Sequence, residues 1–138
     1  MGAIIGKVFA AAISPDGTLI AAGGWTRWTE LDPSDDIYLF DRATGALAHR
    51  ITGLPTTVND LAFSPDGRRL AAALNGPNGL RLYAAELDWA EVAQDASYGG
   101  SSYGIAFASD GRVATTSLDG QLRLYEAGLA GNVAQRLH

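Results

Sequence analysis

The strongest constraint on the fold is a turn sequence that the chain repeats. It reads SPDGTLIAAGG at residues 14–24, SPDGRRLAAAL at 64–74 and ASDGRVATTS at 108–117. The aspartates of these turns, Asp16, Asp66 and Asp110, lie 50 and then 44 residues apart. A second marker, read as IYLFD, LRLYA and LRLYE, recurs at intervals of 43 and 42 residues. Self-similarity at this period is typical of repeat architectures, so we interpret the chain as three copies of one unit.

Each unit predicts four short β-strands. In the second unit VNDLAF (58–63) alternates and ends at the Pro-Asp-Gly turn, and RRLAAAL (68–74), LRLYA (80–84) and WAEVAQ (89–94) follow. Its small residues, Ala71 to Ala73, suit a strand sandwiched closely between neighbouring sheets. The other units have the same order of segments. Roughly twelve strands and no helical periodicity predict an all-β chain of three four-stranded antiparallel meanders, stacked around an axis.

We place the three units at about 7–52, 57–95 and 102–138, within one domain that spans residues 1–138. No run approaches the roughly 18 apolar residues that cross a membrane, and the start of the chain lacks the charged front of a secretory signal. A net charge of -5 gives no electrostatic reason to expect nucleic acid or a membrane surface as partner. The absence of cysteine excludes thiolate chemistry. We expect no cofactor and, by default, a cytoplasmic location.

The SPDG turn, the apolar strand after it and TSLDGQLRLYE (116–126) resemble the blades of WD-repeat β-propellers. The resemblance covers the chain from about residue 7 to the end and implies three degenerate blades. The Trp-Asp pair that closes such a blade is replaced by Phe-Asp at 40–41, Tyr-Ala at 83–84 and Tyr-Glu at 125–126. The buried hydrogen-bond network of the family is implied only for Asp119 and Ser117, with Tyr125 in place of tryptophan.

Three blades are too few for a propeller, which typically needs four to eight. Three open blades would expose an apolar sheet face at each end, and such faces mark interfaces. Two copies related by a two-fold axis would complete a six-bladed ring, so a homodimer is our first expectation. A fragment of a longer propeller from a multidomain signalling protein, or a ring that another partner completes, remains the alternative.

The long segments between strands are WTRWTELDPSDD (25–36), NGPNG (75–79) and DASYGGSSYG (95–104). In the resembled family these segments share one face, and loops on a rigid scaffold concentrate binding residues. Trp25, Arg27 and Trp28 are residue types typical of interface hot spots. The alternative is that the tryptophans cap the core of their own blade.

Four carboxylates follow these tryptophans: Glu30, Asp32, Asp35 and Asp36. We considered them as calcium ligands, but their spacing does not match an EF-hand, and Asp-Pro-Ser-Asp is also ordinary turn chemistry. We therefore predict no metal site, with Asp32, Asp35 and Asp36 as weak candidates.

Phe9, Asn59 and Tyr103 occupy corresponding positions in the first strand of the three units. The resemblance places them near the mouth of the central channel, where such residues contact a protein or peptide. The alternative is that Phe9 and Tyr103 pack against adjacent blades. Tyr98 and Tyr103 also lie in a Gly/Ser-rich segment, which is typical of adaptable contact surfaces.

Catalytic residues have little support in the sequence. His49 and His138 lie in an outer strand and at the chain end, and GGSS (99–102) lacks the pattern of a nucleophile elbow. Only Asp60 is an evident acidic candidate in a first strand for a hydrolase or lactonase-like propeller enzyme with a metal in its channel. We predict instead a non-catalytic binding or scaffolding module for protein or peptide partners.

Overall fold

The computed structural model describes residues 6–26, 34–126 and 134–137, and this part of the chain forms twelve strands in three sheets. The first sheet contains β1 (Lys7–Ile13), β2 (Leu19–Trp25), β3 (Asp35–Asp41) and β4 (Leu47–Leu54). The second contains β5 (Val58–Phe63), β6 (Arg69–Leu74), β7 (Leu80–Ala84) and β8 (Ala90–Asp95). The third contains β9 (Ser102–Phe107), β10 (Val113–Ser117), β11 (Leu122–Tyr125) and β12 (Ala134–Leu137). Two short 3-10 turns, η1 (Gly76–Asn78) and η2 (Ala85–Leu87), flank β7.

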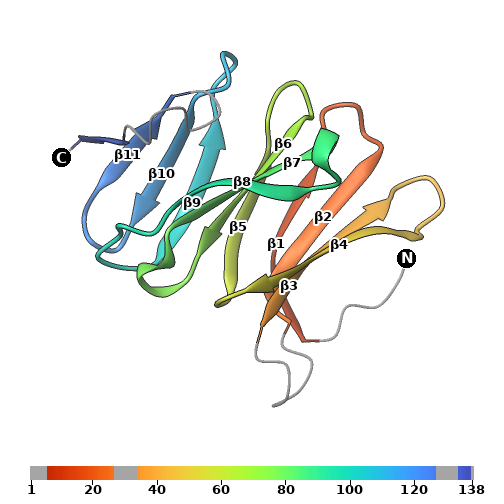
Figure 1. Ribbon diagram of the computed structural model, residues 1–138, viewed down its shortest axis with the longest axis horizontal. Coiled ribbons are helices and arrows are strands. Elements are labelled where there is room, and N and C mark those ends of the chain that lie inside the picture. The colour runs from red at the N-terminus through yellow and green to blue at the C-terminus, as the bar shows by residue number, and fades with distance from the viewer. Residues whose placement is uncertain (1–5, 27–33, 127–133, 138) are drawn as a thin grey trace.

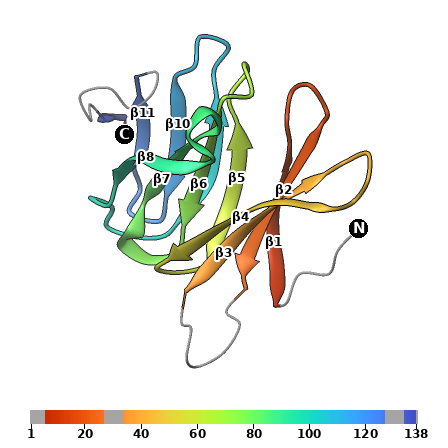
Figure 2. The ribbon, with the colours of Figure 1, turned by 45° about the vertical axis from the view of Figure 1, so that its right-hand side comes forward.

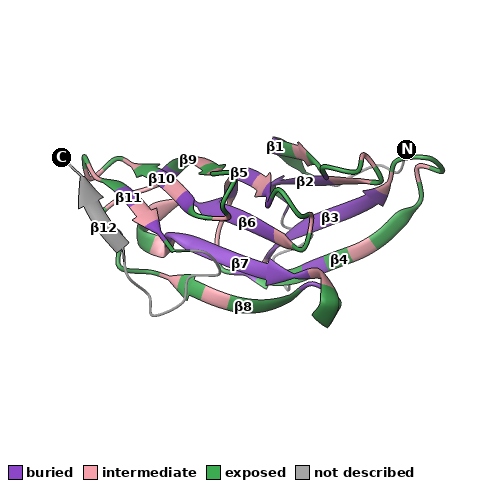
Figure 3. Cartoon of the chain, turned by 90° about the horizontal axis from the view of Figure 1, so that it is seen from above, coloured by how far each residue is buried: buried purple, intermediate pink, exposed green. Residues whose placement is uncertain are grey.

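Every sheet is an antiparallel meander in chain order, so the predicted all-β fold of three four-stranded sheets is confirmed. The sheets lie side by side, with the second between the other two (Figure 1). The first strands are close neighbours, since β5 contacts β1 and β2 on one side and β9 on the other. From above, β1, β5 and β9 line one edge of the row and β4 and β8 the opposite edge (Figure 3). No helix in the described ranges has the length and apolar character needed to cross a membrane.

The repeated turn owes its sequence to a hydrogen-bond pattern. Ser14 Oγ donates to Asp16 Oδ1 at 2.7 Å and accepts the Leu19 N–H at 2.9 Å. Ser64 and Asp66 form the same pair at 2.6 Å. Hydrogen bonds from the Thr18 backbone and from the Ser14 hydroxyl lower the pKa of Asp16 to about 2. These bonds stabilise the turn between the first two strands of the first and second sheets. In the third sheet Ala108 replaces the serine, and Asp110 Oδ1 still accepts the Arg112 N–H at 3.1 Å.

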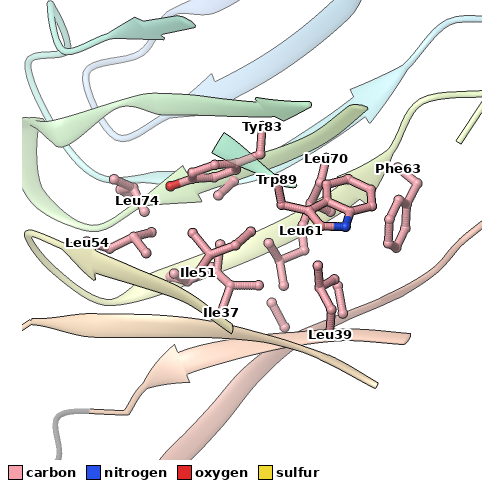
Figure 4. Packing of buried hydrophobic residues seen from close by; sticks show 14 residues of the cluster. Ile37, Leu39, Ile51, Leu54, Leu61, Phe63, Leu70, Leu74, Tyr83 and Trp89 are labelled. Atoms are coloured by element: carbon pink, nitrogen blue, oxygen red, sulfur yellow. The ribbon is translucent and has the colours of Figure 1, made fainter. Parts of the chain in front are cut away.

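The first two sheets meet through an apolar core (Figure 4). The side chains at its centre are buried and come from both sheets: Ile37, Leu39, Ile51, Leu54, Val58, Leu61, Phe63, Leu70, Leu74, Tyr83 and Trp89. The Trp89 ring packs edge-on against Phe63 at 5.9 Å between centroids. Ala71 to Ala73 are fully buried, with Ala72 in this core and Ala71 in the core shared with the third sheet. Small residues thus let β6 lie between two neighbouring sheets.

Candidate functional site

One residue of the first strand bulges out of the ladder in every sheet. In β1 the pairing passes from Val8 to Ala10 and skips Phe9. The same irregularity skips Asn59 in β5 and Tyr103 in β9. The three residues that the sequence aligns are thus equivalent in the structure. A bulge re-aims its side chain, and here it leaves the Phe9 and Tyr103 side chains 57% and 53% exposed rather than packed in a core.

Glycine supports the two aromatic bulges. A Cβ atom at Gly24 would lie 2.1 Å from the Lys7 carbonyl oxygen and 2.7 Å from the Phe9 nitrogen. A Cβ atom at Gly104 would lie 2.6 Å from Oγ1 of a threonine in β10. At Gly24 only a residue without a side chain allows the two backbones to approach this closely, and at Gly104 the missing side chain leaves room for the threonine hydroxyl.

Asn59 has a different environment from the two aromatic residues. Its Nδ2 donates to the Ser102 carbonyl oxygen at 3.0 Å, and the neighbouring Asp60 accepts the Ile105 N–H through Oδ2 at 2.9 Å. Asp60 Oδ1 accepts the N–H of Leu61, also at 2.9 Å. Both side chains therefore tie β5 to β9. The described ranges contain no group of three or more His, Cys, Asp or Glu side chains arranged to hold a metal.

Trp25 ends β2 beside the start of β1, where it pairs with Lys7. Its side chain is 46% exposed, and Lys7 Nζ lies 5.3 Å from the centre of the ring, within the range of a cation–π contact. Val8 (49% exposed) and Leu118 (72%) are further exposed apolar side chains at this end of the strands, which is the lower end in Figure 1. We call this end of the strands, with Val8, Phe9, Trp25, Tyr103 and Leu118, the aromatic end, after its three exposed aromatic side chains. Arg27, Trp28, Glu30 and Asp32 lie outside the described residues.

Asp35 and Asp36 are buried and have partners from the fold. Asp35 Oδ1 accepts the Thr26 N–H at 2.7 Å, and the Asp36 N–H donates to Thr26 Oγ1 at 2.8 Å. Asp36 Oδ2 accepts Arg50 Nε at 2.8 Å. These contacts hold Thr26 and Arg50 against β3. The two carboxylates therefore bind groups of the first sheet itself.

The third sheet has a half-buried polar network around Asp119. Its carboxylate accepts hydrogen bonds from the Ser117 hydroxyl, from the Gly99 N–H at 2.9 Å and from Arg123 Nη2 at 2.7 Å. The bonds from Arg123 and then Ser117 hold the pKa of Asp119 well below its usual range. The structure therefore brings Asp119 and Ser117 together. Arg123 was not predicted as a member of this network, although it stands out as a charged residue within the otherwise largely apolar strand LRLYE.

Tyr125 belongs to a second group, not to the Asp119 network. Its hydroxyl donates to Asp95 Oδ2 at 2.7 Å and shares a hydrogen bond with the Tyr98 hydroxyl at 2.8 Å. The Tyr98 hydroxyl also bonds Thr115 Oγ1 at 2.6 Å, and the Arg123 guanidinium lies 3.9 Å from the centre of the Tyr98 ring. Burial raises the pKa of both tyrosines.

The structure corrects the expectation that Tyr98 lies on an exposed contact surface. Its side chain is only 4% exposed and packs in the core between the second and third sheets. The segment before β9 gains hydrogen bonds as well as apolar contacts by turning this tyrosine inward, because Tyr98 meets Thr115 and Tyr125 there. Tyr98 therefore connects the second and third sheets through apolar packing and hydrogen bonds.

Comparison with known proteins fits this geometry. Residues 45–83 match the model of the WD40 family, described as WD domain, G-beta repeat. A crystal structure of the RRP9 WD40 repeats and a structure of U3-55K each superpose with a TM-score of 0.79 at 18% identity, over 99% of this chain and 40% of those chains. The chain therefore spans less than half the length of these chains. No curated protein matches the sequence. The resemblance seen in the sequence is confirmed: residues 45–83 match a WD40 repeat, and throughout the described residues the chain has the fold of WD40 β-propeller blades.

Proposed function

We propose that this chain is a non-catalytic protein-interaction module that binds a protein or peptide at its aromatic end. The observation that carries the proposal is the display of Phe9 and Tyr103 by equivalent bulges, each more than half exposed. Large aromatic side chains give contact area at a low entropic cost, and they are enriched at binding hot spots. WD40 repeats are known as protein-interaction modules, which supports the same conclusion.

The expected partner offers an apolar or aromatic side chain to this surface. Phe9, Trp25 and Tyr103 supply exposed ring area, and Lys7 adds a positive charge over the Trp25 ring. Arg27 and Trp28 follow Trp25 directly in the sequence and are proposed as further contacts. A catalytic alternative has little support, because both oxygens of Asp60 already accept backbone N–H groups.

We further propose that the module works as a closed ring, with a second copy of the chain completing six blades. The motivation is that the three described sheets form an open row (Figure 2). The second candidate is a three-blade portion of a longer propeller, which is favoured by the 40% coverage of the matched chains.

The binding proposal is tested by selecting peptides from a random displayed library on the purified wild-type protein. Selected peptides should lose at least tenfold in affinity for the Phe9→Ala/Tyr103→Ala variant. They should keep their affinity for Leu87→Ala, which truncates an equally exposed apolar side chain (57%) next to the outer strand β8. Peptides that bind both variants alike would contradict the proposal, as would a library without any enriched sequence.

A further inference from the structure

The second sheet packs with one face on the first sheet, its preceding side, and with the other face on the third sheet, its following side. The repeat allows the equivalent faces of the first and third sheets to be compared with these two, position by position. On the preceding side, Leu61 and Phe63 of β5 pack against the first sheet and are 4% and 9% exposed. Their equivalents in β9, Ile105 and Phe107, pack into the core with the second sheet. The equivalent of Phe63 in β1 is Ile13, which is 61% exposed.

On the following side, the equivalent residues are buried in the first and second sheets and exposed or half-buried in the third. Leu80 and Leu82 of β7 point toward the third sheet and are 0% and 1% exposed. Ile37 and Leu39 are their equivalents in β3, both fully buried against the second sheet. In the third sheet the same repeat position as Leu80 is Leu122, and its side chain is 38% exposed.

The exposed face of the third sheet therefore has the residues of a covered face. Besides Leu122 it presents Ala106, Ala114, Thr116 and Leu124, which are exposed or half-buried. The corresponding positions of the second sheet, Ala71, Ala73 and Leu82, are at most 1% exposed because the third sheet covers them. The repeat thus contains both sides of the contact between neighbouring sheets, and each side has exposed apolar residues at one end of the row: Ile13 in the first sheet and Leu122 in the third.

We propose that the Leu122 face of one copy packs against the Ile13 face of a second copy, head to tail, in the way that each sheet packs on its predecessor within the chain. This inference rests on the proposed ring and names the surfaces that close it. The occupant is a second copy because the new contact continues the established contact between sheets, with Ile13 in the place of Phe63 and Leu122 in the place of Leu80. Two such contacts around a two-fold axis close a ring.

The contact falls mainly near the first strand on the Ile13 side. Tyr38 and Phe40 also belong to that face but are already 7% and 3% exposed. Their rings stack at 6.3 Å, and the Arg50 guanidinium lies 5.6 Å from the Tyr38 ring. Tyr38 and Phe40 are therefore already packed in the free chain. Ile13 and Ala11 are the exposed apolar side chains that a second copy would cover.

The experiment is a complementation test by light scattering on a size-exclusion column. The wild type should show twice the 14.4 kDa mass of the chain. Ile13→Arg and Leu122→Arg each damage one side of every contact, so each variant alone should show half the wild-type mass. An equimolar mixture should recover the mass of two chains, because one undamaged contact forms between the Leu122 side of the first variant and the Ile13 side of the second.

The matched control is Leu118→Arg, which places the same charge on an exposed leucine at the aromatic end and should stay dimeric. Far-UV circular dichroism establishes that the variants keep their strands. A monomeric wild type, an Ile13→Arg variant that stays dimeric, or a mixture that stays monomeric would each overturn the proposal. Peptide selection on the monomeric variants separates the two proposals, since binding at Phe9 and Tyr103 persists if only the ring proposal fails.

Discussion

Tyr125→Phe tests whether the hydroxyl cluster fastens the third sheet to the second. The substitution keeps the ring and removes one hydrogen bond to the Asp95 carboxylate (2.7 Å) and one to the Tyr98 hydroxyl (2.8 Å). A hydrogen bond to a charged group contributes about 1.5–3 kcal/mol, and one between neutral groups contributes about 0.5–1.5 kcal/mol. We therefore expect the free energy of unfolding to fall by roughly 2–4 kcal/mol, a large part of the about 5–15 kcal/mol of a typical domain.

The matched control is Tyr83→Phe, at the same position of the preceding repeat. The Tyr83 ring is also buried, at 3% exposure, but within the described ranges its hydroxyl has no hydrogen-bond partner. Its removal should change the free energy of unfolding by less than about 0.5 kcal/mol. Urea unfolding followed by tryptophan fluorescence measures both variants. Equal losses in the two variants would refute the reasoning, because they would show that the hydrogen bonds of Tyr125 add nothing to its burial.

The same cluster predicts a pH dependence. Burial opposes ionisation of Asp95, but hydrogen bonds from Ser97 and then Tyr125 lower the pKa of Asp95 overall. Its carboxylate therefore contributes stability above the pKa of the unfolded chain, near 4, and this contribution is lost as the pH falls. Part of that acid sensitivity should disappear in Tyr125→Phe.

Three other predictions concern the connections between strands and the repeated turn. Asp60→Ala should lower the free energy of unfolding by about 1–3 kcal/mol because the Ile105 N–H loses its acceptor; an unchanged hydrogen-exchange rate of that amide would contradict this. Gly24→Ala should destabilise by about 1–3 kcal/mol or more, since its Cβ would lie 2.1 Å from the Lys7 carbonyl oxygen; a wild-type melting temperature would be inconsistent with that clash. The pKa of Asp16, lowered to about 2, means that its contribution to stability is present above about pH 4 and is lost between about pH 4 and pH 2; a carboxyl NMR titration of Asp16 with an ordinary midpoint would argue against the turn hydrogen bonds.

The fold could be predicted because its signals are local. In the repeated turn, Ser14 and Asp16 lie two residues apart and form a hydrogen bond with each other. Alternation of apolar and polar residues along VNDLAF indicates a strand without knowledge of its neighbours. Repetition of these signals gives the number of sheets. The pairing of Asp119 with Ser117 was implied by the resemblance to WD repeats, and it is local as well, since the two residues lie two positions apart.

The candidate site depended on contacts between residues far apart in the chain. The sequence aligned Phe9 with Tyr103, but only the register of the strands shows that both are bulged and exposed. Likewise, Tyr98 in a Gly/Ser-rich segment looked like a surface residue, yet its hydroxyl meets that of Tyr125, 27 residues away.

The sequence by itself thus determined the repeat, the turns and the meander of each unit, because these follow from hydrogen bonds and periodicity within a few residues. Only the tertiary structure decided which equivalent positions are covered. Phe63 and Ile13 occupy the same place in the repeat, but one is 9% and the other 61% exposed. The difference arises because burial depends on which sheet lies alongside, and a sheet at the end of a row has a neighbour on one side only.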